Sequence, residues 1–317
     1  MAVKLVEKFL ATTALAGVFV VGGYGRIASA QSNEVSADRA VGADGTFTFS
    51  GSGTGIDDAQ SFDYGAGGDL TIGFADEFGL NNSVLVTIGE DATSNVAISG
   101  PERTDDQTEP SFEIAAPESG DHALRVYHYG AGTVAVDTSS GAISNETAGK
   151  HGVYVYRGGD EAGGDVTLTV GDVSAVGQAV RVRQKDPGKV SVDTTAGTLT
   201  STGDKGLDVK HEAGGDIVIA TAAVSADDDA IDVVHESTGD VTVNTTGGAV
   251  SSVNSIGIDA KHYENGDVSI TSGAVSGDTY AVRVFHYGTG KVTVDTSAGD
   301  LASAGGYGLY VYRADAD

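Results

Sequence analysis

The 317-residue sequence contains no cysteine, no tryptophan, four prolines and a single methionine. Without cysteine there is no disulfide framework and no thiolate-bound metal, so stability outside the cell has to come from packing and backbone hydrogen bonds. Four prolines beside 47 glycines also exclude a proline-rich linker protein.

Basic residues are scarce as well. The chain has 18 Lys and Arg against 45 Asp and Glu, which gives a formal net charge of −27. A surface of this sign repels nucleic acid and anionic lipid. We therefore expect no nucleic-acid partner, whereas cationic partners or divalent ions are compatible with the charge.

The first 30 residues have the layout of a secretory signal peptide. Lys4 and Lys8 precede an apolar run over residues 9–21, and residues 28–30 form a small-x-small cleavage pattern. The run is too short to span a membrane, and no later run reaches eighteen apolar residues. We favour a cleaved signal peptide at 1–30 over a buried N-terminal helix. This predicts export through the inner membrane and no transmembrane segment in the mature chain.

A stretch of fourteen residues occurs twice, as RVYHYGAGTVAVDT at 125–138 and RVFHYGTGKVTVDT at 283–296, with four differences. A four-residue unit of apolar-x-apolar-x, which we call the anchor, recurs through this region at spacings of 24 to 29 residues. The second copy of the stretch lies six anchors after the first, which indicates duplication of a six-repeat block. The eight anchors begin at Leu124, Val153, Val180, Leu207, Ile231, Ile258, Val282 and Leu309.

Each anchor has the pattern of a half-buried strand. Its first and third positions are always aliphatic or Ala, while the second and fourth are charged or aromatic, with Val234 as the exception. A second alternating strand follows about ten residues later, as at 166–168, and a Gly, most often Gly-Asp, precedes it. Glycine suits the bend, and Asp can hydrogen-bond its own turn. A third, shorter apolar element, as at 173–174, completes the repeat.

Three short strands per 24–29 residues leave no room for crossover helices, and a propeller blade would need four strands and roughly forty residues. We predict an all-β, right-handed parallel β-helix over 122–317, in which each strand pairs with its equivalents one coil above and below. Residues 31–121 are predicted to form irregular early coils or an N-terminal cap, with 101–120 as a surface excursion. Because the sequence stops just after the eighth anchor, we also expect a fragment of a longer protein, truncated at its C-terminus.

Five histidines share one column of the repeat, four residues after the start of the anchor. Imidazoles on successive coils could bridge a metal, but a metal site needs convergent ligands. A polar ladder at a turn is therefore the favoured interpretation, with no metal or other cofactor, and close imidazoles should disfavour one another's protonation. The five are His128, His211, His235, His262 and His286.

Three aspartates, Asp208, Asp232 and Asp259, stack on consecutive coils at the second anchor position. Clustered carboxylates could form a hydrolase cleft or a cation site. Arginines in the same column (Arg181 beside Asp208, and Arg283 beside Asp259) and the absence of loop insertions favour a solvated acidic strip with weak, exposed ion pairs. Calcium binding by the Gly-Asp turns is disfavoured, since they recur once per coil rather than every nine residues.

Outward aromatic residues form two short ladders. Such ladders stabilise a sheet by cross-strand contacts, and they also occur on surfaces that contact sugars or proteins. We favour the structural role. The ladders consist of Tyr127 and Tyr156 with Tyr154 beside them, and of Phe285 with Tyr310 and Tyr312.

The coil pattern, as in GIDAKHYENGDVSITSGAVSGDTYAVRVFHYGTGKVTVDT at 257–296, resembles the passenger repeats of bacterial autotransporters, the type V secreted surface proteins. The resemblance covers about residues 122–317. It implies a non-catalytic, adhesin-type passenger at the cell surface of a Gram-negative bacterium or secreted from it, with a host-surface protein or glycan as partner. It also implies an outer-membrane barrel, for which this chain lacks the amphipathic strands, so the barrel would lie on a missing C-terminal part.

The alternative is a β-helical enzyme acting on polysaccharides, a lyase or hydrolase, with a groove beside the three aspartates. The sequence contains no Gly-Asp-Ser-Gly motif, no His-Glu-x-x-His motif and no phosphate-binding loop. We therefore expect a protein without enzymatic activity.

Overall fold

The computed structural model describes most of the chain from residue 120 onward and parts of the chain before it. Apart from a two-residue antiparallel pair, β1 (Val20–Val21) with β2 (Gly25–Arg26), the predicted signal peptide lies outside the described residues. The described ranges are 20–21, 25–26, 38–41, 46–50, 60–64, 69–76, 78–90, 93–101, 110–116, 120–159 and 163–314.

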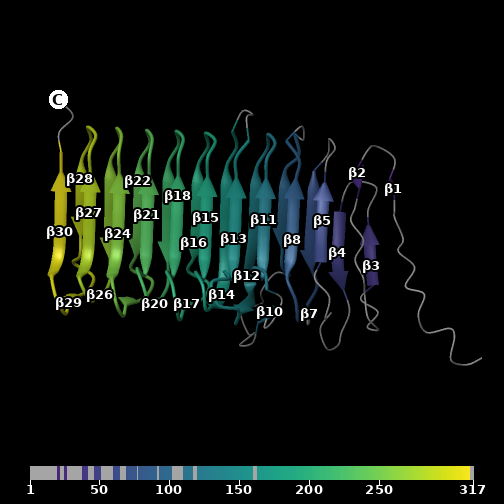
Figure 1. Ribbon diagram of the computed structural model, residues 1–317, viewed down its shortest axis with the longest axis horizontal. Helices are drawn as coiled ribbons and strands as arrows, with labels where there is room; N and C mark the ends of the chain where they lie inside the picture. The colour runs from purple at the N-terminus through teal and green to yellow at the C-terminus, as the bar shows by residue number, and fades with distance from the viewer. Residues whose placement is uncertain are drawn as a thin grey trace, which may run out of the picture.

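The protein is an all-β parallel solenoid of about nine turns (Figure 1), as the repeat predicts. Successive coils stack side by side along the long axis of the molecule, each in contact with its neighbours. The described residues contain strands, turns and loops but no α-helix, and hence no helix that could cross a membrane.

The anchors build one sheet of parallel strands, which we call the anchor sheet, and its register matches the predicted columns. Leu124 pairs with Val153, Val153 with Val180, and so on to Leu309. The strands of the anchor sheet are β5 (Gln60–Tyr64), β8 (Val84–Ile88), β11 (Leu124–His128), β13 (Val153–Arg157), β15 (Val180–Gln184), β18 (Leu207–His211), β21 (Ile231–His235), β24 (Ile256–His262), β27 (Tyr280–His286) and β30 (Tyr307–Arg313).

The second and third strands of each coil form the rest of the wall. The second strands are β4 (Thr46–Ser50), β6 (Leu70–Phe74), β9 (Val96–Ser99), β12 (Val134–Asn145), β14 (Val166–Ala175), β16 (Val190–Thr194), β19 (Ile217–Thr221), β22 (Val241–Thr245), β25 (Val268–Ser272) and β28 (Val292–Asp295). The third strands are β7 (Phe78–Leu80), β10 (Phe112–Ala116), β17 (Leu199–Ser201), β20 (Val224–Ala226), β23 (Val250–Ser252), β26 (Val275–Gly277) and β29 (Leu301–Ser303). In β12 and β14 the second and third strands are continuous, and β3 (Asp38–Val41) pairs antiparallel with β4.

The core is built from ladders of identical or similar side chains. Val126, Val155 and Val182 stand on successive coils at the third anchor position, and all are fully buried. Alternation with period two places these residues inside and the charged and aromatic ones outside. Toward the N-terminus the ladder is aromatic: the Phe49 and Phe74 rings lie 5.3 Å apart, and those of Phe74 and Phe112 lie 4.9 Å apart.

Part of residues 31–121 forms coils in register with the later ones. Gln60 of β5 pairs with Val84 of β8, which pairs with Leu124 of β11. The predicted surface excursion at 101–120 is wrong for β10, because Phe112 and Ile114 are buried and the strand pairs with both neighbouring coils. The prolines flank this strand rather than interrupt it, and residues 102–109 lie outside the described residues.

The glycines before the second strands have a backbone conformation that other residues rarely adopt. Gly215 has φ +139°, and a Cβ there would lie 2.1 Å from the carbonyl oxygen of Gly188 on the preceding coil. The sequence predicts that the Asp after this glycine bonds its own turn. Its carboxylate instead accepts a hydrogen bond from the next coil. Oδ1 of Asp216 accepts a hydrogen bond from the backbone N–H of Asp240, and Oδ1 of Asp240 accepts one from that of Asp267. The recurring Gly-Asp thus joins one coil to the next.

Candidate functional site

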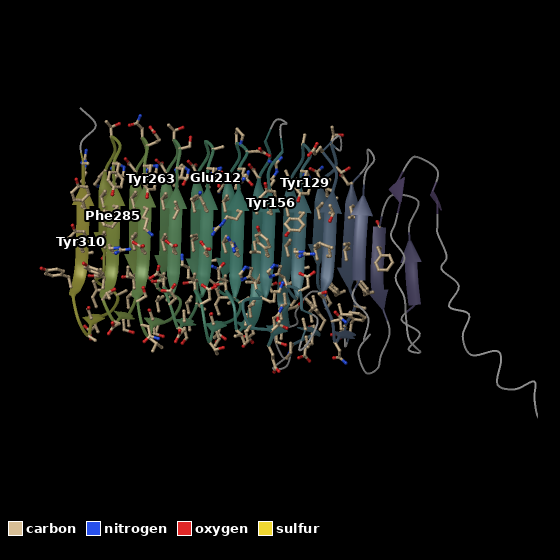
Figure 2. The ribbon with its side chains drawn as sticks, in the orientation of Figure 1. Tyr129, Tyr156, Glu212, Tyr263, Phe285 and Tyr310 are labelled. Atoms are coloured by element: carbon tan, nitrogen blue, oxygen red, sulfur yellow. The ribbon has the colours of Figure 1, made fainter. Side chains whose placement is uncertain are left out.

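The outward side chains of the anchor sheet, from β11 to β30, form a surface that we call the anchor face. Figure 2 shows labelled members of this face, among them Tyr129, Glu212 and Tyr310, along the length of the solenoid. Aromatic rings gather at its two ends, and charged side chains occupy the coils between them. Most of these side chains come from the second and fourth anchor positions, where alternation points side chains away from the core.

The first aromatic patch lies on β11 and β13. The Tyr127 and Tyr156 rings, predicted as a ladder, have centroids 5.8 Å apart, and Tyr154 lies 5.7 Å from Tyr127. Tyr129, which the anchor pattern did not include, lies 5.6 Å from Tyr156. The guanidinium carbon of Arg125 stands 5.1 Å from the centre of the Tyr127 ring, a cation–π contact.

The second aromatic patch repeats this arrangement six coils later, on β27 and β30. Phe285 lies 5.8 Å from Tyr310 and 5.9 Å from Tyr312, as predicted, and Arg283 stands over Phe285 at 5.3 Å. Tyr287, the equivalent of Tyr129, extends the patch.

Tyr263 of the preceding coil joins the second patch. Its ring stacks on that of Tyr287 at 5.2 Å with an interplanar angle of 5°, and these two side chains are 43 % and 37 % exposed. Sequence reasoning missed Tyr129, Tyr263 and Tyr287. Following the alternation for one more outward position, two residues past the anchor, would have found them.

The three stacked aspartates are buried, so the predicted solvated acidic strip is wrong. Asp208, Asp232 and Asp259 are only 2 %, 4 % and 0 % exposed. They do stack in register on β18, β21 and β24. An aspartate side chain is short, and the long Arg and Lys side chains of neighbouring columns and coils lie over it.

Arginine forks hold the two ends of the aspartate column. Arg183 donates to both carboxylate oxygens of Asp208, at 2.9 and 2.5 Å, whereas the predicted partner Arg181 lies 4.0 Å away. Arg283 donates to both oxygens of Asp259, at 2.9 and 2.7 Å. These bonds are bidentate and largely shielded from water, so the exposed, weak pairs expected from the sequence are in fact strong ones.

Lysines hold the middle of the column. Lys261 bridges Asp232, at 3.0 Å, and Asp259, while Lys205 donates to the other oxygen of Asp232. Burial alone would raise the pKa of Asp232, but the two ammonium groups outweigh it and hold that pKa below its usual value. The carboxylates raise the pKa of Lys261 against the opposing effect of burial. The column is therefore an internally neutralised ionic network.

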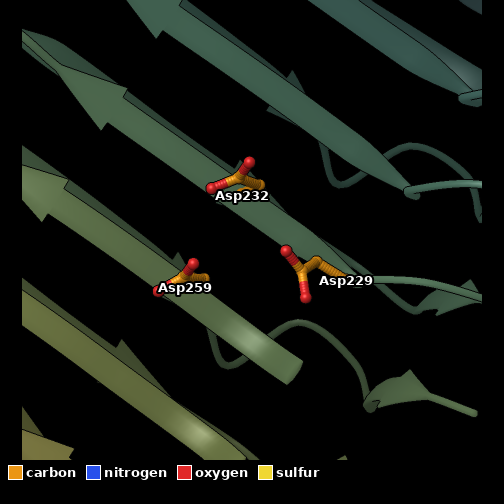
Figure 3. A group of neighbouring side chains, drawn as sticks. All are labelled: Asp229, Asp232 and Asp259. Carbon is orange, nitrogen blue, oxygen red and sulfur yellow. The ribbon is translucent and has the colours of Figure 1, made fainter. Parts of the chain in front are cut away.

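A fourth carboxylate, Asp229, lies beside this network (Figure 3). Asp229, Asp232 and Asp259 offer oxygen atoms within 4.8 Å of one another, the one such group among the described residues. Oδ1 of Asp229 already accepts hydrogen bonds from Ser255, at 2.5 Å, and from the backbone N–H of residue 256, and burial raises its pKa. A divalent cation bound here would have to displace two lysine ammonium groups, which the observed pairing disfavours.

The five column histidines point into the core, because the residue directly after the anchor continues the inward alternation. Each is 0–1 % exposed, and its Nε2–H donates to a backbone carbonyl while Nδ1 has no partner. Four of the rings form a continuous ladder in which the centroids of consecutive rings are 4.8–5.1 Å apart; the four are His211, His235, His262 and His286. The donor–acceptor distances are 2.8 Å for His128 to Ser94, 3.3 Å for His211 to Asp186, 2.8 Å for His235 to Gly215, 3.1 Å for His262 to Ser237 and 2.8 Å for His286 to Gly266.

Burial favours the neutral form of four of these imidazoles. It lowers the pKa of His211 and of His262 to about 4, with the neighbouring His235 adding to the effect, and it also lowers the pKa of His128 and His235. The ladder is thus a structural hydrogen-bonding column inside the wall, directed at single carbonyls. Its rings do not converge on a shared point as metal ligands would.

Other residue types fill the same column where histidine is absent. Gln184 donates through Nε2 to the carbonyl of Gly164, at 2.9 Å. Arg157 is fully buried and donates to the carbonyl of Gly132 at 3.1 Å and to Asp186 at 3.0 Å. The common requirement of the column is therefore a donor that satisfies a turn carbonyl of the coil wall.

A second histidine pair, which sequence reasoning missed, lies beside the first aromatic patch. The rings of His122 and His151 stack at 4.5 Å, and Nδ1 of His122 accepts a hydrogen bond from the backbone N–H of His151. Burial lowers the pKa of His122 to about 4 and that of His151 to about 3. Their column lies two residues before the anchor, so the anchor unit did not contain them.

Comparison of the whole chain with known protein families, curated proteins and solved structures gives no significant match.

Proposed function

We propose that the chain is a non-catalytic, adhesin-type β-solenoid that is exported and works at the cell surface of a Gram-negative bacterium or beyond it, and that it binds its partner through the anchor face. The resemblance of its coils to autotransporter passengers and the N-terminal signal pattern support export and display, with a barrel on a further C-terminal part. A host-surface protein or glycan is the expected partner.

The observation that carries this proposal is the composition of the anchor face. Tyrosine and arginine are the residues most enriched where proteins bind partners, and here they form two equivalent patches on a straight, regular wall. A wall of stacked coils keeps such groups at fixed spacing, so less conformational entropy is lost when they are ordered on binding. This favours binding through an extended face.

The burial of the aspartates supports a non-catalytic role over the lyase or hydrolase alternative. A general acid, base or nucleophile has to come within hydrogen-bond reach of the substrate. Asp208, Asp232 and Asp259 instead lie beneath arginine and lysine side chains that occupy their oxygen atoms.

The proposal is tested by a binding screen of the purified chain against glycans and surface proteins, beside a double variant, Tyr129→Ala with Tyr287→Ala. We expect at least a tenfold loss of any binding in this variant. The matched control is Thr242→Ala with Thr271→Ala, on the outward side of β22 and β25, which should bind normally. Equal binding by all three proteins would rule out the anchor face, and depolymerisation of a polysaccharide by the wild type would overturn the non-catalytic assignment.

A further inference from the structure

We infer that the partner of the anchor face is a second copy of this chain, docked face to face with its solenoid axis antiparallel. The inference rests on the proposed function, because it concerns the same face, and it names a second copy as the occupant in place of the host-surface protein or glycan that the resemblance implies. Four observations carry it: the charge of the face, the orientation of its rings, its symmetry and its area.

The anchor face is nearly neutral on a strongly acidic molecule. The face is made of four columns of side chains: the column two residues before the anchor, the second and fourth anchor positions, and the column two residues after the anchor. These columns hold eight basic and six acidic side chains, a formal charge of +2, against −27 for the chain. Like charge opposes the approach of two copies elsewhere on the surface, and least at this face. The residues are Arg125, Arg181, Arg183, Lys185, Lys205, Lys210, Lys261 and Arg283, with Asp208, Glu212, Asp229, Asp232, Glu236 and Asp259.

The exposed rings of Tyr263 and Tyr287 cover one another's faces. Tyr263 and Tyr287 stack on each other at 5.2 Å with nearly parallel planes, and Phe285 and Tyr287 are also nearly parallel, at 6.2 Å. A sugar ring stacks on the open face of an aromatic ring, and that face is covered where two rings stack in parallel as these do. Ring edges and phenolic hydroxyls instead suit edge-to-face and cation–π contacts with aromatic and arginine side chains.

The two aromatic patches are placed symmetrically on the face. Between β11 and β30 the midpoint falls between β18 and β21. A half-turn about an axis through that midpoint, parallel to the strands, lays β11 on β30 and β13 on β27. Arg125 then opposes Tyr310, and Tyr154 opposes Arg283. Each of these strands with an arginine at its second anchor position therefore faces a strand with a tyrosine at that position. An interface of this kind is isologous and closed.

At the centre of the face the same rotation brings together side chains with satisfied charges. Asp208 opposes Asp232, but each is already neutralised by basic residues of its own chain. Arg181, 4.0 Å from Asp208, opposes the position of Asp259, whose oxygens are held by Arg283 and Lys261 of its own chain. Arg183 opposes Lys261 and Glu212 opposes Glu236, and each of these four side chains is paired with an opposite charge of its own chain. A half-turn about the solenoid axis would instead place Arg181 against Arg183 of the other copy.

The face is large enough for a stable dimer. Eight strands spaced about 4.8 Å apart, each with about five residues rising roughly 3.3 Å, cover on the order of 650 Å² per copy. The total of roughly 1,300 Å² lies within the usual range of specific interfaces, about 1,200–2,000 Å².

The first experiment is sedimentation velocity of the purified 317-residue chain over a hundredfold range of concentration. We expect a concentration-dependent dimer whose dissociation constant rises at least tenfold in Tyr129→Ala with Tyr287→Ala. Thr242→Ala with Thr271→Ala should behave as the wild type, and circular dichroism should show all three to be folded. A wild type that stays monomeric throughout, or a dimer that the tyrosine variant does not weaken, overturns the inference.

The second experiment fixes the orientation and uses the absence of native cysteine. A short bismaleimide should link Arg125→Cys to Tyr310→Cys in a mixture of the two variants and should not link Arg125→Cys to itself. Linkage in the mixture of Lys210→Cys and Val234→Cys is expected as well, since these positions flank the midpoint. Efficient linkage of Arg125→Cys to itself, without linkage to Tyr310→Cys, overturns the antiparallel arrangement.

The two proposals fail in distinguishable ways. A monomeric chain that binds a glycan or a foreign protein, and loses it in the tyrosine variant, overturns only the second copy as occupant. A monomeric chain whose tyrosine variant changes no binding at all overturns the proposed function with it.

Discussion

Arg157 places a positive charge inside the wall of the solenoid, and a single carboxylate, that of Asp186, neutralises it at 3.0 Å. Removing one partner of a buried pair leaves the other charge uncompensated. We expect Arg157→Ala to lower the free energy of unfolding by about 3–5 kcal/mol in urea titrations.

The matched control for this variant is Arg313→Ala, in the same column of β30, where the side chain is exposed. It should cost less than about 1 kcal/mol. Because Asp186 is the uncompensated charge, Arg157→Ala with Asp186→Ala should recover part of the loss. Equal effects of Arg157→Ala and Arg313→Ala would contradict the assigned role of the pair.

Single residues also mark where sequence reasoning stopped. Alternation correctly placed Asp208, Asp232 and Asp259 in one outward column. It could not show that they are buried, because that depends on Arg183 and Lys261 folding over them. Periodicity fixes the direction of a side chain from the backbone, whereas its exposure depends on the length of its neighbours.

At the scale of the element, the turn before each second strand depends on glycine. We expect Gly215→Ala to destabilise the protein by about 1–3 kcal/mol, because φ +139° is strained for alanine and its Cβ would meet the Gly188 carbonyl oxygen at 2.1 Å. The neighbouring Gly214→Ala is the control, since a Cβ there has ordinary contacts of 3.4 Å or more. Thermal unfolding of the two variants, followed by circular dichroism, should separate them by several degrees. Equal midpoints would show that the turn tolerates a side chain.

The histidine ladder makes the stability of the coils depend on pH. Since the folded pKa of His211 and His262 is about 4, against about 6.5 unfolded, the unfolded chain binds more protons between these values. The contribution of these two neutral histidines to the free energy of unfolding is complete above pH 6.5 and is lost as the pH falls toward 4. We expect each to cost about 2 kcal/mol of unfolding free energy between pH 7.5 and 5.

The measurement is a urea titration at both pH values, with His211→Gln and His262→Gln combined as the comparison. Glutamine already serves this column as Gln184, keeps the donor and does not titrate. The double variant should therefore lose about 4 kcal/mol less than the wild type on acidification. An unchanged pH dependence would show that these histidines are not the groups that titrate.

Sequence reasoning performed well at this scale where the repeat was regular. Each of the eight anchors begins at the first residue of a strand of the anchor sheet or within two residues of it. The strand β5 begins with a polar residue, Gln60, and the first residues of β8 and β11, Val84 and Leu124, are 40 positions apart. Column counting therefore could not reach these early coils, although their strands stack in the same register.

At the scale of the whole molecule, the contrast between an acidic body and a neutral face predicts an unusual salt response. Added salt screens the repulsion between two chains of net charge −27. The aromatic contacts proposed for the interface are screened much less. We expect self-association to strengthen severalfold between about 20 and 300 mM NaCl, as measured by sedimentation. Weakening over this range would point to an interface held by opposite charges.

Each coil of this protein is attached only to the coils beside it, by strand pairing, the Gly-Asp bonds and the packed core, and no covalent cross-link joins them. When the chain is pulled apart from its ends, a coil can therefore leave the stack without disturbing the rest. Each departure would release roughly 80–100 Å of extended chain in place of about 4.8 Å of stacked length. Under load the solenoid would thus unfold one coil at a time, while the remaining coils stay stacked.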